Sequence, residues 1–153
     1  MKNFLMVTAA FMLMCLSFSC RKIQEGMIIK GLWTLEGFYV DTFSKNMMEI
    51  FLPYYNTGNG CCRYKIDFQD DDLVTGYYFT HDTLNYLVAG TWKLIKYNKI
   101  YVKLDNYVDG EFTIEKIGNK RYEMISDSNR IKAFEVIMPH LDTAYTRIVA
   151  RRN

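Results

Sequence analysis

Thiol and imidazole groups are the side chains in this sequence that could carry covalent catalysis or bind zinc. Two neighbouring cysteines, Cys61 and Cys62, are accompanied by only two histidines, His81 and His140. A catalytic thiol needs a histidine held beside it, and nothing in this spacing brings the two together. Zinc binding by Cys61, Cys62 and His81 is a weak alternative, because tetrahedral sites usually separate their cysteines by two or more residues. In an oxidising compartment the cysteine pair could form a vicinal disulfide, pair between molecules or stay as buried thiols.

A run of aspartates, Asp70 to Asp72, supplies oxygen ligands of the kind that calcium prefers. An EF-hand loop also needs a glycine and a distal glutamate at fixed positions, and both are missing here. The run is therefore predicted to be a solvated turn. The sequence also lacks a nucleophile elbow, a phosphate-binding loop, a metal-binding histidine helix and a supported pair of catalytic carboxylates. We therefore expect a protein that is not an enzyme and that uses no cofactor or metal.

Residues 1–19 have a pattern typical of a secretion signal. Lys2 gives a basic start, and the run from Phe4 to Phe18 is apolar except at a threonine and a serine. This run is shorter than the roughly 18 to 20 residues that cross a bilayer, so it indicates a signal peptide and not a permanent anchor. Ser19 followed by Cys20 resembles the lipobox of bacterial lipoproteins, in which the cysteine becomes the diacylated N-terminus. An ordinary cysteine beyond a plain secretory cleavage site is the alternative.

This pattern divides the chain into a signal peptide at 1–19, a lipidated tether at 20–29 and one domain at 30–153. Two acyl chains on Cys20 would hold the protein stably in the membrane lipid, because each buried methylene contributes about 0.8 kcal/mol. We expect a position on the outer membrane of the cell envelope, facing the periplasm. The reason is that the residues after Cys20 lack the acidic run that marks surface export in some lipoproteins.

Charge and aromatic content indicate a β-rich domain that does not bind nucleic acid. The chain has 19 basic and 17 acidic residues, so its charge is nearly balanced. No basic stripe of the kind that tracks a phosphate backbone persists along it. Its aromatic content is high, with 12 tyrosines, 10 phenylalanines and 2 tryptophans. Strands favour aromatic residues, whereas helical bundles favour leucine and alanine.

Apolar and polar residues alternate along several segments with the period of two that is typical of strands with one covered face. These segments are 64–69, 100–105, 112–115 and 121–124. Turn signals separate them at 58–60, 70–72, 98, 109–110, 118–119 and 127–129. Asp109-Gly110 and Gly118-Asn119 are dipeptides of the hairpin type. Consecutive hairpins predict an antiparallel meander that closes on itself, because an open sheet of this length would leave exposed edges.

Two Gly-x-Trp motifs, Gly31 to Trp33 and Gly90 to Trp92, begin similar segments. In both, a leucine follows the tryptophan two places on, and an aromatic residue ends the segment. A glycine beside each tryptophan would let a neighbouring backbone or ring approach closely. Both tryptophans are expected to fill the bottom of a barrel, or the seam between two similar halves, as core residues.

A lipoprotein signal, a short tether and Gly-x-Trp motifs before runs of hairpins resemble the bacterial lipocalin-like lipoproteins, over about Lys30 to Ile148. The resemblance implies an all-β fold, a small antiparallel up-and-down barrel of about eight strands. It also implies a central cup for a small apolar ligand. The arginine-bearing final motif of true lipocalins has only a loose candidate here, Arg147.

The segment from Ser44 to Tyr55 interrupts the β pattern where lipocalin barrels carry a lid over their open end. Asn46 could cap a short helix with Glu49 as its partner, and Pro53 would end that helix. Methionine and aromatic side chains adapt well to irregular apolar ligands. We therefore expect a bound ligand to contact these residues: Met47, Met48, Phe51, Tyr64 and Tyr78. The alternative is a helical plug that only fills one end of the barrel with core residues.

Functions of different kinds fit these features. The leading interpretation is a membrane-anchored protein that binds a small apolar molecule in the cup, with tyrosine hydroxyls fixing its orientation. A second is an interaction or structural protein whose barrel is filled by its own side chains and whose surface docks a membrane protein partner. A third uses exposed tyrosines to stack against glycans. A cavity lined by methionine and phenylalanine would favour the first, a packed interior under an exposed aromatic patch the second, and an outer row of tyrosines the third.

Overall fold

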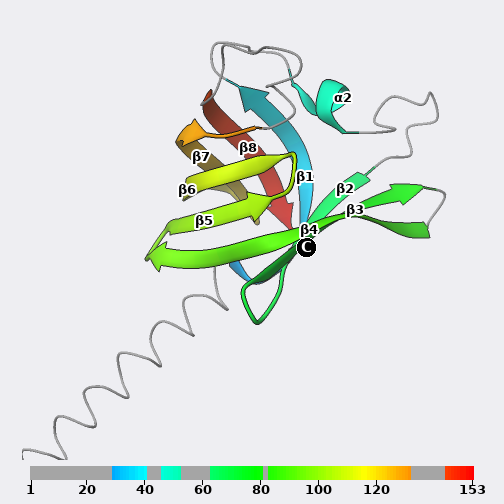
Figure 1. Cartoon of the computed structure of the whole chain (residues 1–153), viewed down its shortest axis with the longest axis horizontal. Coiled ribbons are helices and arrows are strands. Elements are labelled where there is room, and N and C mark those ends of the chain that lie inside the picture. Colours follow the sequence, from blue (N-terminus) through cyan, green and yellow to red (C-terminus); the bar gives the residue numbers. More distant parts are fainter. Residues whose placement is uncertain (1–28, 41–45, 53–62, 81–82, 132–143) are drawn as a thin grey trace, which may run out of the picture. The chain divides into compact units, whose positions relative to one another are not determined.

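The computed structural model describes residues 29–40, 46–52, 63–80, 83–131 and 144–153. The chain divides into the units Met1–Lys30 and Gly31–Asn153, and the second unit is a closed barrel of eight antiparallel strands (Figure 1). The strands are β1 (Gly31–Val40), β2 (Arg63–Phe68), β3 (Leu73–Thr80), β4 (Thr83–Lys96), β5 (Lys99–Leu104), β6 (Val108–Gly118), β7 (Arg121–Asn129) and β8 (Ala144–Arg152). Each strand pairs with its neighbours in sequence, and β8 pairs with β1. The predicted all-β up-and-down barrel is therefore confirmed.

Alternation along the strands separates an apolar interior from a polar exterior, as the sequence predicted. On β5, Ile100, Val102 and Leu104 are buried, while Lys103 between them is exposed. The single short helical piece expected after the first strand is also present, as α2 (Met48–Phe51). Closure leaves no strand of the barrel without a partner on either side, which removes the edges that would otherwise template aggregation.

The barrel has two ends that differ in content. The Gly31 end carries the start of β1, the turns β2–β3, β4–β5 and β6–β7, and the end of β8. The α2 end carries the connections β1–β2, β3–β4, β5–β6 and β7–β8, including α2 itself.

An aromatic cluster fills the Gly31 end. Phe68 lies between the two tryptophans, with its ring centroid 6.2 Å from that of Trp33 and 5.6 Å from that of Trp92, both edge-on. The ring of Tyr122 packs edge-on against Trp33 from β7, 5.0 Å away. All three rings of the central stack are almost fully buried. The two Gly-x-Trp motifs thus meet in one core across the barrel.

Gly90 is required where it stands by a close approach of two strands. A Cβ atom at this position would lie 1.9 Å from the carbonyl oxygen of Lys103 on β5. Trp92, two residues on, is fixed by two hydrogen bonds to the β2–β3 turn. Its backbone N–H donates to Asp72 O at 2.8 Å, and its indole N–H donates to Gln69 O at 3.1 Å.

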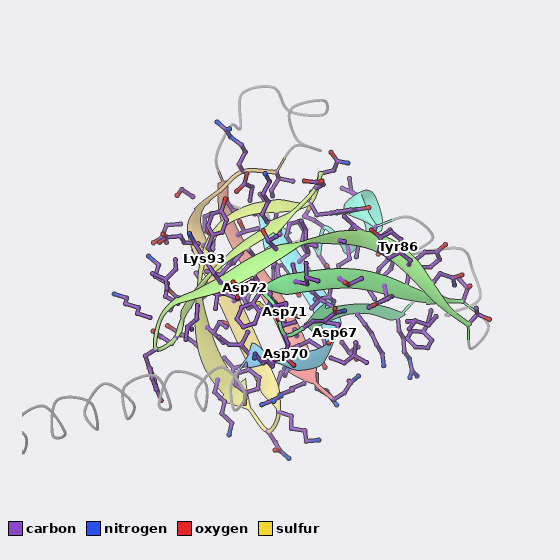
Figure 2. All side chains as sticks on the ribbon, turned by 60° about the horizontal axis from the view of Figure 1, so that its bottom comes forward. Asp67, Asp70, Asp71, Asp72, Tyr86 and Lys93 are labelled. Atoms are coloured by element: carbon purple, nitrogen blue, oxygen red, sulfur yellow. The ribbon has the colours of Figure 1, made fainter. Side chains whose placement is uncertain are left out.

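Three of the predicted turns lie where the sequence put them. Asp70 to Asp72 form the β2–β3 turn, with Asp71 and Asp72 at positive φ (62° and 61°). Figure 2 shows these aspartates beside the part of β4 that carries Lys93. Turns also occur at Asn98 and after Gly118.

Two predicted turns are wrong. Asp109-Gly110 lies inside β6, and the β5–β6 turn falls earlier, at 105–107, where Asn106 takes a φ of 70°. Gly110 serves packing instead, because a Cβ there would lie 3.1 Å from the side-chain oxygen of Asn129. The segment 127–129 likewise belongs to β7, whose pairing with β8 is interrupted by an irregularity. The predicted turn at 58–60 lies outside the described residues.

Candidate functional site

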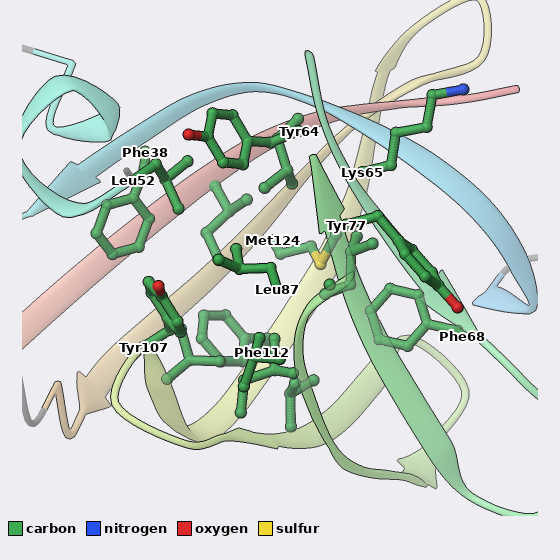
Figure 3. A pocket seen from close by; sticks show the side chains of 18 residues that line it. Phe38, Leu52, Tyr64, Lys65, Phe68, Tyr77, Leu87, Tyr107, Phe112 and Met124 are labelled. Carbon is green, nitrogen blue, oxygen red and sulfur yellow. The ribbon is translucent and has the colours of Figure 1, made fainter. Parts of the chain in front are cut away.

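An apolar cavity of about 80 Å³ lies inside the barrel (Figure 3). Its walls come from β1 through β8 and from the residue after α2. They consist of Leu35, Phe38, Leu52, Tyr64, Lys65, Ile66, Phe68, Gly76, Tyr77, Leu87, Val88, Val102, Leu104, Tyr107, Val108, Phe112, Met124 and Ile148. Most of these side chains are aliphatic or aromatic, and Figure 3 shows the ammonium group of Lys65 directed away from the others. The cavity can therefore receive an apolar group but offers little to a charged one.

The strands on one side of the cavity separate toward the α2 end. β1 pairs with β2 only over 31–34, although it pairs with β8 from 33 to 40. Cavity-lining residues lie on both sides of this opening, Leu35 and Phe38 on β1 and Tyr64 on β2. We call this opening the β1–β2 seam.

The segment leading into α2 binds to β1 along the seam. The side-chain oxygen of Asn46 accepts hydrogen bonds from Phe38 N–H at 3.0 Å and from Met48 N–H at 3.1 Å. The backbone N–H of Met47 donates to Phe38 O at 2.6 Å. These bonds satisfy backbone groups of β1 that β2 does not reach, so Asn46 replaces a strand partner. Leu52, at the end of α2, then lies against the cavity.

Asn46 bonds the start of α2, but from one place before the N-cap position. The residue at the N-cap position of α2 is Met47, and it makes no side-chain capping bond. Asn46 stands one place earlier, and its side-chain oxygen accepts the N–H of Met48 in α2, as a helix cap would, as well as the N–H of Phe38 on β1. Glu49 is exposed in the first turn of the helix.

Two tyrosines bring hydroxyl groups to the cavity wall. Figure 3 shows the hydroxyls of Tyr64 and Tyr107 on the same side of the cavity, toward Phe38 and Leu52. Burial raises the pKa of the Tyr107 hydroxyl above its ordinary value, so the group stays protonated at neutral pH. A protonated hydroxyl at the edge of an apolar cavity can donate one hydrogen bond to the polar end of a ligand.

The five residues predicted to contact a ligand fall into different places. Tyr64 lines the cavity. The ring of Tyr78 lies beside it, with 6.3 Å between the two centroids, but Tyr78 is not part of the wall. Met47 and Met48 are buried without lining the cavity. The side chain of Phe51 lies outside the described part.

For several wall residues, the sequence contained no indication of a role in a ligand site. Leu87 is the extra residue of a β-bulge between β3 and β4, since Gly76 pairs with Val88 and Tyr77 pairs with Tyr86. Tyr107 belongs to the β5–β6 turn, which the sequence placed elsewhere. Phe112 and Met124 follow the strand alternation, and that pattern alone identified them as interior residues.

Tyr77, which borders the cavity, also forms a tyrosine pair toward the outside of the barrel. Tyr77 and Tyr86 are direct cross-strand partners on β3 and β4, and Tyr86 is 63% exposed. Lys65 pairs with Tyr77 on the same face, and its ammonium lies 4.8 Å from the ring centroid of Phe79. One face of Phe79 is thus already covered by a cation.

The described residues show no cluster of three or more His, Cys, Asp or Glu side chains placed to hold a metal ion. Cys20, Cys61, Cys62, His81 and His140, on which the sequence-based thiol, zinc and lipid predictions rest, all lie outside the described part. No helix among the described residues has the length and hydrophobicity needed to span a membrane.

The barrel is of the eight-stranded up-and-down class to which lipocalin folds belong, so the fold is compatible with the predicted resemblance. No family model, curated protein or solved structure matches the chain.

Arg147 does not lie among the core tryptophans. It lies on the outside of β8, 3.0 Å from Glu123 and with its guanidinium 4.3 Å from the ring centroid of Tyr39. The residue opposite Trp33 on β8 is Arg152.

Proposed function

We propose that this protein is a lipid-anchored, non-enzymatic protein of the cell envelope whose barrel binds a slender apolar molecule. The observation that carries the ligand proposal is the apolar cavity at the β1–β2 seam, with Tyr64 and Tyr107 on its wall. The lipid anchor rests on the signal-like segment and Cys20. The closed barrel supports the ligand proposal, because it is a stable container, and has no bearing on the anchor.

The size of the cavity restricts the ligand. At about 80 Å³ it is smaller than the roughly 150 Å³ cavity that takes up benzene in a protein core. Pockets for drug-sized molecules are larger still, at roughly 300 to 1,000 Å³. A narrow group such as the end of an acyl chain fits this space, with the rest of the molecule leaving through the seam.

Binding would follow from burial of the apolar group and from orientation by a hydroxyl. Each methylene moved from water into the cavity contributes about 0.8 kcal/mol. The Tyr107 hydroxyl would donate to a carboxyl or ester oxygen near the mouth. Leu52 would cover the chain where it crosses the seam, because among the described residues it is the one that the α2 segment contributes to the wall.

Mass spectrometry of the protein purified from its own membrane tests the ligand. A small molecule present under native conditions and released on denaturation is the expected result. An empty, fully folded protein would contradict the proposal and favour a barrel filled by its own side chains, which docks a membrane protein.

A matched pair of variants tests the location. Ile148 lines the cavity, whereas Ile125 is half-buried on the outer face of the adjacent strand. Ile148→Phe should fill the cavity and weaken binding of a fluorescent C18 fatty acid by about tenfold or more, as expected when one well-packed apolar contact surface is lost. Ile125→Phe should bind like the original protein. Equal binding by both variants would place the ligand elsewhere.

The anchor has its own test, which does not depend on the cavity. The intact mass of the mature protein should show diacylglycerol and an acyl chain on Cys20, and Cys20→Ser should leave the protein out of the membrane fraction. An unmodified Cys20 in the mature protein would refute the anchor and leave the ligand proposal standing.

A glycan-binding surface is the second candidate, favoured by the outward pair Tyr77 and Tyr86. An exposed ring such as that of Tyr86, with the half-buried ring of Tyr77 beside it, can stack against a sugar. Tyr86→Ala should then reduce retention on immobilised cell-wall glycan, while Tyr97→Ala, which removes an equally exposed ring at the other end of the barrel, should not. Equal retention of both variants would dismiss this surface.

A further inference from the structure

We propose that the Gly31 end of the barrel docks on an anionic lipid bilayer through the β4–β5 and β6–β7 hairpins. The surface consists of three apolar and three basic side chains, named here the basic rim: Ile95, Lys96, Tyr97, Lys116, Ile117 and Lys120. The proposal builds on the anchored protein proposed above and assigns the face that meets the membrane.

The two isoleucines of the basic rim are turned outward by local backbone irregularities. Leu94 pairs with Ile100 and Lys96 with Lys99, so Ile95 is the extra residue of a bulge. Ile117 is the extra residue of a second bulge in the β6–β7 hairpin, between Lys116 and Gly118. Bulges re-aim side chains in this way, and here both place an isoleucine beside a turn.

These residues are well exposed for their type. Ile95 is 41% exposed, Ile117 43% and Tyr97 64%. Each stands next to a lysine in sequence, so the rim alternates apolar and cationic groups. Tyrosine and basic residues around isolated apolar side chains are the composition of a surface that sits at the lipid headgroups.

The lysines of the basic rim are available to lipid phosphates. Lys96, Lys116 and Lys120 are exposed, and none forms an ion pair with another described residue.

Three other cations at this end, Lys99, Arg121 and Arg151, are paired with carboxylates. Lys99 pairs with Glu111 at 2.6 Å. Arg121 and Arg151 both pair with Glu36, at 2.6 and 2.8 Å. The rim lysines therefore stand out as uncompensated charge.

The basic rim lies at the end of the barrel where the tether joins. The β6–β7 turn is linked to the end of β8, since Arg152 N–H donates to Lys120 O at 2.8 Å. Asn153 N–H in turn donates to Leu32 O on β1, at 3.1 Å. Cys20 precedes Gly31 by 31 − 20 = 11 residues, so the tether spans at most about 40 Å. A lipid on Cys20 would hold this end at a high local concentration near the bilayer.

The acidic β2–β3 turn determines how the barrel would tilt. Asp70 to Asp72 lie at the same end but two strands away from the β4–β5 turn, and they would be repelled by an anionic surface. The barrel should therefore lean toward the β4–β7 side. A bilayer fits the rim better than a protein partner does, because lysine is depleted at the centre of protein interfaces.

Hydrogen exchange on the membrane-derived protein tests the docking. The protein is reconstituted into nanodiscs of phosphatidylcholine alone or mixed with phosphatidylglycerol at about 7 to 3, a strongly anionic surface. Amides of the β4–β5 and β6–β7 turns should exchange about tenfold more slowly on the anionic discs, and about 1 M salt should abolish the difference because the Debye length falls to ~3 Å. The β5–β6 turn at the α2 end should be unaffected.

Charge-reversal variants provide the matched control. Lys96→Glu with Lys120→Glu should remove the protection, whereas Arg63→Glu with Arg130→Glu changes the net charge equally, away from the rim, and should retain it. Ile95→Ser with Ile117→Ser should also reduce it, while Leu84→Ser on the β3–β4 hairpin should not.

The outcomes separate this proposal from the anchor. Equal protection on neutral and anionic discs, or protection only in native membranes, would overturn the docking proposal, and the latter would indicate a protein partner. Slower hydrogen exchange of the rim on anionic discs, in a protein whose intact mass shows no lipid, would support the docking proposal. It would refute only the anchor proposal.

Discussion

Phe68 is the residue on which the packing of the Gly31 end depends. Its ring contacts both tryptophans and is 1% exposed. Trp92 in turn is hydrogen-bonded to the β2–β3 turn through Gln69 and Asp72. One side chain therefore joins β1, β2 and β4 through ring contacts.

Replacing Phe68 by alanine should lower the free energy of unfolding by about 3 to 5 kcal/mol, the usual cost of removing a buried phenylalanine. Urea unfolding followed by tryptophan fluorescence measures this loss, and Trp33 and Trp92 report on the site itself. Phe79→Ala, at a half-exposed outer position, should cost clearly less. Equal losses would show that the aromatic cluster does not dominate the core.

Ionisation of the Tyr101 hydroxyl should make the free energy of unfolding depend on pH in the alkaline range. It donates a hydrogen bond to the Asp109 carboxylate, and this bond, burial and the nearby negative charge raise its pKa above 10. Below about pH 10 the stabilisation that this hydrogen bond gives the folded state is fully present, because the phenol is protonated in both the folded and the unfolded state. As the pH rises beyond 10, the unfolded state ionises first and the stability falls.

Tyr101→Phe should therefore make the free energy of unfolding fall less steeply above pH 10. Urea titrations at several pH values between 9 and 11 measure the slope. Asp109→Asn should have a similar effect, because it removes the charged acceptor. Slopes identical to that of the original protein in both variants would contradict this account. Burial also raises the pKa of Tyr107. Tyr107 should therefore maintain part of the dependence of stability on pH in both variants.

At the scale of elements, the α2 segment closes the β1–β2 seam through the side chain of Asn46, and not through backbone pairing between strands. Asn46 accepts two backbone hydrogen bonds that a strand partner would otherwise satisfy. Such a contact is local and involves few bonds. The α2 segment should therefore open more readily than any paired strand of the barrel.

Asn46→Ala should destabilise the protein by about 1 to 2 kcal/mol and speed exchange of the Phe38 and Met48 amides. It should also speed release of a bound fatty-acid probe, if the ligand leaves through the seam. Asn85→Ala is the control, since Asn85 bonds Thr80 and Thr83 within the β3–β4 hairpin. It should cost similar stability without changing probe release. Equal release from both variants would place the ligand path elsewhere.

At the scale of the whole barrel, closure depends on contacts between the two ends of the domain. β1 and β8 pair along most of their length. Glu36, the extra residue in this pairing, binds Arg151 on β8 and Arg121 on β7. Contacts this distant in sequence are costly to form, because most of the chain must be ordered first.

Removal of 144–153 should cause aggregation, because it exposes edges on both β1 and β7. Size-exclusion chromatography with light scattering measures this. Among the described residues, removal of Asn153 alone loses its bonds to Leu32 and Thr34, and it should not cause aggregation. A monomeric, folded product of the longer deletion would show that the barrel does not need closure.

The sequence alone determined the class of fold. Period-two alternation is a local property of a half-buried strand, so Ile100, Val102, Phe112 and Met124 could be assigned to the interior without any structure. The Gly-x-Trp motifs likewise identified Trp33 and Trp92 as core. Residue type and spacing suffice for such assignments because every strand of this barrel has one covered face.

Only the tertiary structure decided where the chain turns and where the cavity lies. Asp109-Gly110 has hairpin chemistry, yet it stays within β6 because Asn129 packs against Gly110. The bulge at Leu87 sends that side chain to the cavity wall, while Met47 and Met48 are buried elsewhere. A bulge shifts the register of two paired strands at once, so its effect depends on residues far away in sequence. The alternation of apolar and polar residues in one strand contains no information about its partner strand.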